Sequence, residues 1–411
     1  MRESGSEQII RPALARCLDI DPEDFATNVW SIGPHVSHVD DDFADLFSQQ
    51  AVDELVSTHG LRTPFARMAN QGKLVSESSY TGSTGSGAGV PDQLIDDKVF
   101  RYFSDGASLV LQGLHRTWRP LRLFSDQLAL DLGHPIQINA YITPPQSQGF
   151  ASHHDTHDVF VIQIAGTKQW RIHRPVITDP TADQTFDTVK PQIAKAAEQE
   201  PFLDTRLECG DVLYLPRGWI HSATADGEVS IHLTIGIHQF TRMDVLRRAI
   251  NQLAQSEEFR ASLPIGAGTS PRSLDDEVAR TLKDVAATIE SVSVPTLSDN
   301  IARNFRRQTR PEPIGPLEQL AAVRGLTPEG QLRLRRGLVA TVSELEDGRI
   351  RLICGARRLT MPSQCRAALD QFATGEVLTV GRLPELDEAD SLTLSRRLLS
   401  EAVAVIVDDP S

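Results

Sequence analysis

Two short histidine-containing segments constrain this chain more than any other feature of its sequence. His153 and Asp155 stand two residues apart, directly before an apolar, β-rich run over 159–164. Residues two apart on a strand point to the same face, so this pair can bind one metal ion while the residue between them points away. The later segment 210–221 predicts a turn, a strand and a Pro-Arg-Gly bend that end at a third ligand, His221. Two imidazoles and one carboxylate leave open metal positions, which suits non-heme Fe(II).

The composition is that of an ordinary globular protein. A chain of 411 residues is long enough for two or three domains. The net charge of −14 argues against a large nucleic-acid-binding surface. No apolar run reaches the roughly 18 residues of a membrane span, and the first residues lack the apolar core of a signal peptide. The four cysteines are scattered, with no CxxC pair. We therefore expect a cytoplasmic protein with reduced cysteines and no membrane partner.

Short β-type runs separated by turn residues fill the chain between 98 and 240. A helical pattern interrupts them at 118–133. Many short strands with turn punctuation are typical of a barrel or jelly roll, a class that includes the cupins. We therefore predict a barrel over 98–240. The clearest strand-like runs cover residues 107–112, 136–142, 159–164, 169–173, 211–215 and 229–238.

The segment before the predicted barrel is less regular. Residues 1–97 mix helical and irregular signals, with helical spacing over 41–59. The Ser/Thr/Gly-rich stretch 78–89 is typical of a flexible loop, and a lid or peptide-binding loop is the alternative. The run 35–42 contains histidine and aspartate and could suggest another metal site, but a solvated acidic loop explains it better.

Two further regions follow the predicted barrel. Helical stripes return over 241–310, and their apolar faces either complete a core or form a dimer. A proline-rich linker at 310–316 then separates them from a small α+β module at 311–411. Two strands of that module meet at the hairpin signal Asp347-Gly348. The pattern suits a helix-and-wing shape, but the charge of the module does not support DNA binding.

A set of motifs around the metal-ligand segments matches one known family. The matching motifs are 104–108, 138–145, 147–150, 153–160, 166–171 and the segment ending at His221. Together they resemble the JmjC-type (cupin-4) Fe(II)/2-oxoglutarate oxygenases of the ribosomal oxygenase group. The resemblance implies an α+β fold built on a double-stranded β-helix, the jelly-roll barrel of cupins. It also implies a helical dimerisation region at 241–310 and a winged-helix-like domain at 311–411, with 1–97 packing on the barrel.

The resemblance assigns roles to individual residues. His153, Asp155 and His221 would hold Fe(II), and Lys168 would bind the distal carboxylate of 2-oxoglutarate with its compact charge. Without the resemblance, Lys168 is best explained as a solvated turn residue. The Tyr141 hydroxyl could also reach the cosubstrate, although its pattern alone fits a half-buried strand aromatic. Further pocket candidates are Asn139, Thr234 and His232.

Four polar neighbours of the ligands are not expected to bind the metal. His154, His157 and His173 are interpreted as solvent-facing or as supports for a ligand. Asp158 is expected to orient a ligand by hydrogen bonding.

The resemblance implies a protein hydroxylase that consumes 2-oxoglutarate and O₂. Its expected target is an arginine or histidine side chain of a ribosomal protein, and a homodimer is the expected assembly. Nε-methyl-lysine demethylation is an alternative, because it uses the same iron site. A metal-binding cupin scaffold without oxygenase activity is another alternative, and the same ligands could hold Zn²⁺.

Overall fold

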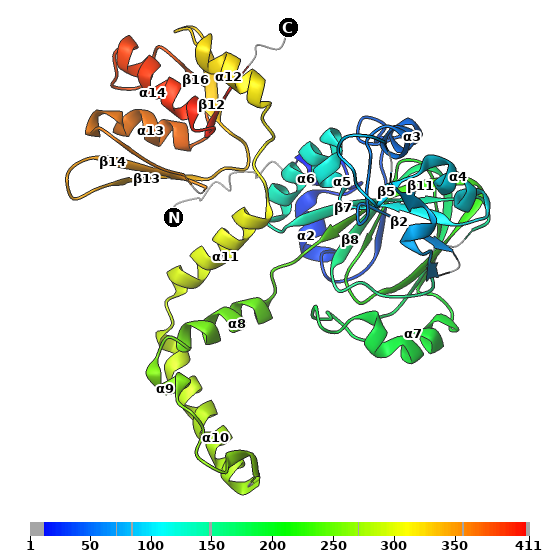
Figure 1. Ribbon diagram of the computed structural model, residues 1–411. Helices are drawn as coiled ribbons and strands as arrows, with labels where there is room; N and C mark the ends of the chain where they lie inside the picture. Colours follow the sequence, from blue (N-terminus) through cyan, green and yellow to red (C-terminus); the bar gives the residue numbers. More distant parts are fainter. Residues whose placement is uncertain are drawn as a thin grey trace. The chain divides into compact units, whose positions relative to one another are not determined.

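The computed structural model of the chain describes residues 12–70, 72–83, 85–147, 150–269, 271–355 and 357–407 (Figure 1). The chain divides into two compact units, one comprising Gln239–Gln308 and the other comprising the residues before and after it. The first of these coincides with the helical region predicted at 241–310. None of the described helices has the length and apolar character needed to cross a bilayer.

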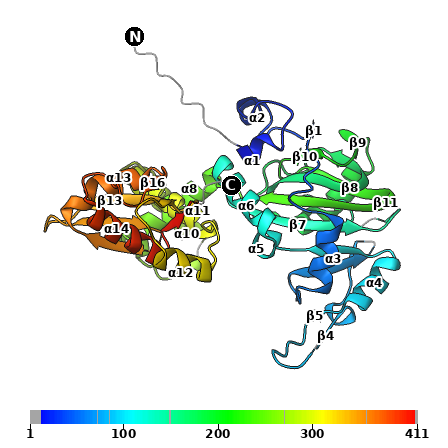
Figure 2. The same cartoon turned by 90° about the horizontal axis from the view of Figure 1, so that it is seen from above.

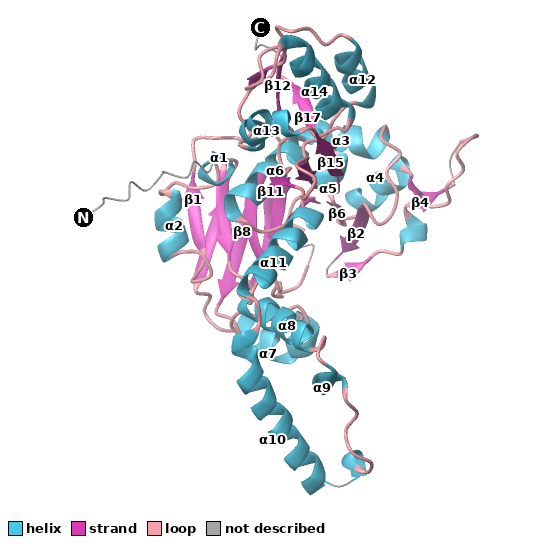
Figure 3. Cartoon of the chain, turned by 90° about the vertical axis from the view of Figure 1, so that its left-hand side faces the viewer, coloured by secondary structure: helices cyan, strands magenta, loops and turns pink. Residues whose placement is uncertain are grey.

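Antiparallel strands form the main sheet, in agreement with the predicted jelly roll. Among the described residues the sheet has nine strands in the order β1-β10-β8-β11-β7-β6-β2-β3, with β9 paired to β8 (Figure 3). Its buried faces carry the cores of the barrel. The strands are β1 (His35–His38), β2 (Ala66–Asn70), β3 (Lys73–Leu74), β6 (Ser108–Leu111), β7 (Ile136–Thr143), β8 (Asp158–His173), β9 (Leu203–Leu207), β10 (Asp211–Leu215) and β11 (Ile220–Ile237).

The two long strands β8 and β11 pair with each other through most of the barrel. Two runs predicted as separate strands, 159–164 and 169–173, belong to one strand, β8. The Gly166-Thr167 signal between them marks a bend rather than a chain reversal. Gly166 has φ +61°, and a Cβ there would lie 2.3 Å from the Val229 carbonyl oxygen, so only glycine fits.

The N-terminal region contributes strands that local patterns did not predict. Residues 35–38 of the run 35–42 are not a loop, because they form β1, which pairs with β10. Both histidines of the run already hydrogen-bond a carboxylate. His35 Nε2 lies 2.9 Å from an Asp19 carboxylate oxygen, and His38 Nδ1 lies 2.6 Å from an Asp211 carboxylate oxygen. A short polar run that pairs with a distant segment at the edge of a sheet shows no periodic pattern. The sequence therefore did not predict β1.

Helices and short strands cover the sheet. The helix expected over 41–59 is present only as α3 (Gln49–Ser57), and the loop expected at 78–89 contains the short strand β4. The helix predicted at 118–133 is confirmed as α6, which packs with α5 beside β7 (Figure 2). The remaining elements around the barrel are α1 (Pro12–Ala15), α2 (Pro22–Asn28), β4 (Thr81–Gly82), β5 (Gln93–Leu94), α4 (Asp96–Ser104), α5 (Leu114–Thr117), α6 (Arg119–Leu132) and α7 (Lys190–Ala197).

The C-terminal segment has a hydrophobic core of its own and two three-stranded sheets. The predicted hairpin is confirmed, because β13 and β14 pair on either side of the Asp347-Gly348 turn. The helix α12 and the third strand β15 were not predicted. The elements are α12 (Pro316–Arg324), β12 (Gln331–Leu334), β13 (Ala340–Glu344), β14 (Ile350–Cys354), β15 (Arg357–Met361), α13 (Arg366–Ala373), β16 (Leu378–Thr379), α14 (Glu388–Ser400) and β17 (Ala404–Ile406).

The unit Gln239–Gln308 is helical, as predicted. Its first helix begins with a capping box, in which Thr241 and Asp244 satisfy each other's backbone N–H groups. Several apolar side chains of the unit are exposed. The helices are α8 (Arg242–Leu253), α9 (Glu257–Arg260), α10 (Pro271–Thr288) and α11 (Val294–Gln308).

Candidate metal and cosubstrate site

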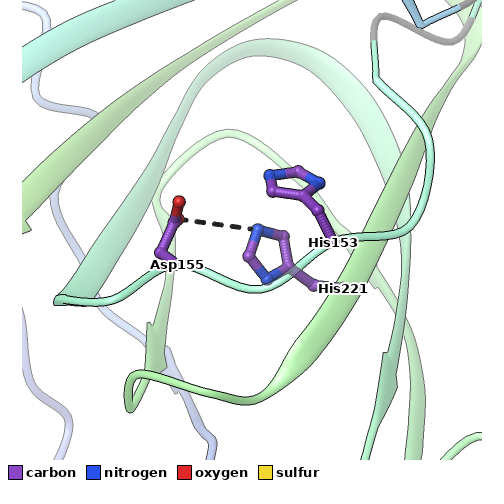
Figure 4. Close-up of side chains that lie close together, drawn as sticks. All are labelled: His153, Asp155 and His221. Carbon is purple, nitrogen blue, oxygen red and sulfur yellow. Dashed lines mark ion pairs between the residues drawn. The ribbon is translucent and has the colours of Figure 1, made fainter. Parts of the chain in front are cut away.

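The three predicted metal ligands come together at one end of the barrel. Figure 4 shows the side chains of His153, Asp155 and His221 turned toward one another. One ligand atom from each residue lies within 4.8 Å of the others, which is close enough to share a metal ion. His221 Nε2 is 3.8 Å from the nearer Asp155 carboxylate oxygen.

The backbone conformation around the first two ligands differs from the predicted one. His153 and Asp155 precede β8 and do not lie on a continuous strand. Instead, His153 forms an isolated antiparallel bridge with His221, through N–H···O=C bonds of 3.2 Å and 2.9 Å. The bridge brings His153 beside His221, so the three residues selected by the spacing argument lie close together although the strand that it assumed is absent.

Backbone carbonyls select the protonation state of both histidines. His153 Nδ1 lies 2.8 Å from the Ala151 carbonyl oxygen, and His221 Nδ1 lies 3.1 Å from that of Trp219. A carbonyl can only accept a hydrogen bond, so Nδ1 carries the proton and Nε2 keeps its lone pair. Burial, followed by the charge of His153, lowers the pKa of His221 to about 4. A neutral imidazole with a free Nε2 is the form that binds a metal.

The carboxylate of the triad is ionised. Burial alone would raise the pKa of Asp155, but the neighbouring histidines, His157 foremost, outweigh it and hold that pKa below its ordinary value. Two imidazoles and one carboxylate therefore form a donor set that fits Fe(II) and leaves coordination positions free.

The triad lines a pocket of about 510 Å³ that also contains the predicted cosubstrate anchor, Lys168. Lys168 is only 4% exposed and lies within β8, so its interpretation as a solvated turn residue is wrong. Its Nζ donates to Thr143 Oγ1 at 3.0 Å and lies 3.4 Å from His232 Nδ1. No acidic side chain in the described ranges forms an ion pair with it, and burial lowers its pKa to about 7. A buried amine without a counter-ion fits a carboxylate ligand.

The weaker pocket candidates divide into two groups. Tyr141 stacks on His232 with ring centroids 5.0 Å apart, and both line the pocket, as does Thr234. Burial raises the pKa of Tyr141, so its hydroxyl stays protonated as a hydrogen-bond donor. Asn139 does not line the pocket, because its Oδ1 accepts a hydrogen bond from the Gly113 N–H at 3.0 Å.

The histidines near the ligands are not solvent-facing. His154 is 2% exposed, and its Nε2 lies 3.1 Å from the Gln184 carbonyl oxygen. His173 is also buried, and His157 stacks on His238. Of the two alternatives expected for these histidines, solvent exposure therefore does not apply to His154 and His173.

Asp158 supports the turn that leads to His221. It is fully buried, its carboxylate accepts the Arg217 N–H at 2.8 Å, and it forms a second, short hydrogen bond with the Tyr214 hydroxyl. The next N–H, of Gly218, donates to the Asp155 carbonyl at 3.0 Å. The buried carboxylate thus ties the second ligand segment to the first.

Several residues that line the pocket were not predicted as pocket residues, among them two aromatic and two basic ones. Arg67 comes from β2, and Phe150 from the segment before His153. Phe186 lies in the 3-10 turn Phe186–Val189, and Lys190 begins the helix α7 that follows it. The Phe186 ring lies 6.0 Å from the His153 ring, and the Arg67 guanidinium lies 5.3 Å from the Phe150 ring centre. Phe150 belongs to the matching motif 147–150, but no local motif marks Arg67, Phe186 or Lys190, because distant segments bring them to the pocket.

Residues 115–245 match the JmjC domain family, and this stretch contains the metal triad and Lys168. The chain contains a JmjC domain. The resemblance to JmjC-type ribosomal oxygenases that the motifs indicated is therefore confirmed. The fold is also shared with the X-ray structure of Escherichia coli ycfD, with a TM-score of 0.52, 17% identity and coverage of 95% of this chain and 99% of that one.

Curated relatives match this JmjC domain and its surroundings. Ribosomal oxygenase 1 of Rattus norvegicus is 33% identical over 258 residues, which cover 57% of this chain and 42% of the relative. The bifunctional lysine-specific demethylase and histidyl-hydroxylase NO66 of Drosophila erecta is 31% identical over 208 residues, which cover 46% of this chain and 31% of the relative. The chain therefore spans less than half the length of these relatives.

Proposed function

We propose that this chain is an Fe(II)- and 2-oxoglutarate-dependent protein hydroxylase. One observation carries the proposal: the metal triad and the buried, unpaired Lys168 line the same pocket. The triad suits an oxygen-activating metal with open positions, and the lysine suits the far carboxylate of a dicarboxylate. A scaffold without activity would have no use for a buried amine that lacks a counter-ion.

The residues of this chain position the reactants. Lys168 and Thr143 bind the distal carboxylate, and the Tyr141 hydroxyl can donate a further hydrogen bond. Iron held by the triad would supply the oxidation, in which one atom of O₂ enters a target C–H bond and the other enters succinate as 2-oxoglutarate loses CO₂. The aromatic wall around the ligands, which includes Phe150 and Phe186, excludes water from the reacting carbon.

The target class is proposed from the names of the relatives. Ribosomal oxygenase 1 and a histidyl-hydroxylase share this domain, so we infer that the substrate is an arginine or histidine side chain of a ribosomal protein. Demethylation of Nε-methyl-lysine is the second candidate, because the NO66 relatives are also named as lysine-specific demethylases. A ribosomal substrate fits the cytoplasmic location expected from the sequence.

The regions outside the barrel have proposed roles as well. We infer that Gln239–Gln308 forms a homodimer contact, because Met243, Leu246 and Ile250 of α8 are exposed and apolar. The C-terminal segment, with its hairpin, added strand and helices, is proposed to be a winged-helix-like domain.

Succinate formation tests the proposed reaction. Protein loaded anaerobically with Fe(II) would be mixed with 2-oxoglutarate, O₂ and peptides from ribosomal proteins, and we expect peptide-dependent succinate and one oxygen atom added to a peptide. Mass spectrometry of ribosomal proteins from a deletion strain then separates hydroxylation from demethylation, since the first predicts loss of an oxygen atom and the second gain of methyl groups. The absence of both turnover and metal-dependent 2-oxoglutarate binding would rule out the proposal.

A further inference from the structure

The guanidinium of Arg67 lies beside the aromatic side chains that stand next to the metal ligands. It lies on β2, opposite Val110 of β6, which in turn lies opposite Tyr141 of β7. Its guanidinium lies 5.3 Å from the centre of the Phe150 ring. The Phe150 ring lies 5.9 Å from the Tyr141 ring and 6.3 Å from the ring of the metal ligand His153. Arg67, Phe150 and His153 all line the pocket, so a target side chain that reaches the metal enters the same cavity as this guanidinium.

The charge of Arg67 is not neutralised within the described part of the chain. No acidic side chain there forms an ion pair with it, its Nε is buried without a hydrogen-bond partner, and its guanidinium hydrogen-bonds the uncharged Tyr141 hydroxyl. Lys190, the other cation near the mouth, differs because it forms an ion pair with Asp187. Arg67 thus lines the pocket with a positive charge that has no acidic partner among the described residues.

The other charged groups of the site do not compensate Arg67. Asp155 is the only acidic residue among the described residues that line the pocket, and it is a metal ligand. In the proposed complex, a divalent metal, the Asp155 carboxylate, Lys168 and a dicarboxylate cosubstrate balance one another's formal charges. The positive charge of Arg67 therefore acts in full on whatever side chain approaches the metal.

A cationic target side chain meets two penalties in such a pocket. It loses its hydration without gaining a carboxylate partner, and it enters the field of a like charge in surroundings of low dielectric. A neutral imidazole avoids both penalties, and its unprotonated nitrogen can accept a hydrogen bond from the guanidinium. Negative selection by an unpaired charge is a recognised way to obtain specificity.

We propose that Arg67 is a specificity-determining residue that makes this pocket prefer an uncharged target side chain, an imidazole, over a guanidinium or an Nε-methylammonium group. This inference rests on the proposed function and narrows its substrate class. It selects histidyl hydroxylation from the alternatives that the metal triad leaves open.

Matched peptides test the proposal on the full chain. Each peptide carries a central histidine and has two counterparts that differ only by arginine or Nε-methyl-lysine at that position. Binding is measured by calorimetry with Mn(II) and 2-oxoglutarate, and turnover by succinate formation with Fe(II). We expect wild type to prefer the histidine peptide at pH 8, and this preference to shrink near pH 6, where the peptide imidazole gains a proton.

Variants of Arg67 then locate the origin of the preference. Arg67→Gln should reduce the preference for histidine over arginine by about tenfold in kcat/KM, and Arg67→Lys should retain most of it. The affinity for 2-oxoglutarate should stay within about threefold of wild type, since Lys168 provides that contact. Arg62→Gln is the matched control, because Arg62 is a more exposed arginine that pairs with Asp92 and does not line the pocket.

The outcomes separate this inference from the proposed function. A wild type that prefers the arginine or methyl-lysine peptide overturns the inference, and so does an Arg67→Gln variant whose preference is unchanged while turnover persists. If no peptide binds or stimulates succinate formation, the proposed protein hydroxylase itself fails, and the role of Arg67 fails with it.

Discussion

At the scale of single residues, hydrogen bonds determine which neighbouring histidine can bind a metal. The Nδ1 atom of His153 hydrogen-bonds the Ala151 carbonyl, which directs Nε2 to the site. In His154, by contrast, Nε2 is the atom that hydrogen-bonds a carbonyl, that of Gln184. Two adjacent imidazoles in the sequence thus have opposite functions. The surroundings of Lys168 matter in the same way, because its burial without a counter-ion fits the carboxylate-binding role that we propose for it.

Substitutions at the two adjacent histidines should distinguish the proposed metal ligand, His153, from its neighbour, His154. His153→Ala removes one of three ligands, and we expect its Co(II) affinity to fall by more than about 100-fold, since structural metal–ligand bonds contribute several kcal/mol. His154→Gln should bind Co(II) within about threefold of wild type, because its ring faces Gln184. Titration followed by visible absorption measures both. Equal losses in the two variants would contradict the assigned triad.

The buried Lys168 predicts a pH dependence for 2-oxoglutarate binding. Its pKa is lowered to about 7 in the free protein, and a bound carboxylate favours its charged form. Above pH 7 binding must therefore take up a proton, so the affinity is constant below about pH 7 and falls by up to tenfold per pH unit above it. Calorimetry of the Mn(II)-loaded protein in buffers of different ionisation enthalpy would detect the proton uptake.

Removal of the amine should abolish this dependence. Lys168→Ala should bind 2-oxoglutarate about 10- to 100-fold more weakly at pH 7, the value expected for a charge-assisted hydrogen bond, and with a flat profile above pH 7. Lys195→Ala changes an exposed lysine of α7 outside the pocket and should behave like wild type. An unchanged affinity in Lys168→Ala would show that another group binds the cosubstrate.

At the scale of elements, the pairing of β8 with β11 holds the site together. Lys168 lies on β8 beyond the bend at Gly166, and His221 lies near the start of β11. The bend brings β8 close to the Val229 carbonyl, where a Cβ on residue 166 would clash. The geometry of the pocket therefore depends on a glycine that makes no contact with any reactant.

Alanine at Gly166 should destabilise the barrel. The strained φ and the clash with backbone together should cost about 3 kcal/mol or more. Gly227→Ala is the matched control, because Gly227 also has a positive φ of +72° but has open space around it, and it should lose only about 1 kcal/mol. Chemical denaturation measures both losses, and similar values for the two variants would show that close packing at Gly166 is unimportant.

At the scale of the whole molecule, the chain combines a barrel, a separate helical unit and a C-terminal segment with its own core. The helical unit exposes apolar side chains that a monomer would leave in water, among them Ile250 at 54% and Leu246 at 50% exposure. Such a face favours association of two copies through this unit.

Charges placed on that face should prevent dimerisation. We expect Leu246→Glu combined with Ile250→Glu to yield a monomer by light scattering, because burying two carboxylates in an apolar contact is unfavourable. Lys283→Glu, a charge change at an exposed position of α10, should leave the oligomeric state unchanged. A dimeric double variant, or a monomeric wild type, would refute the predicted role of Gln239–Gln308.

The sequence by itself determined the ligand types, the barrel class and most of its strands, because these follow from local spacing and alternation. It also supplied Lys168 as the candidate cosubstrate anchor, although only through resemblance, since the local pattern around Lys168 indicates a turn. The bridge between His153 and His221, the edge strand β1 and the strand β2 were decided only in the folded chain. Hydrogen bonds between distant segments leave no periodic trace in either segment.

The same distinction holds inside the pocket. The metal triad could be predicted from spacing, but Asn139 shares a strand face with Tyr141 and still bonds the Gly113 N–H outside the pocket lining. Arg67 lines the pocket only because β2 pairs with β6 and β6 pairs with β7. Sequence therefore determined which chemistry the site can support. The tertiary structure decided which charges surround the metal, because side chains remote along the chain meet there only after the sheet has formed.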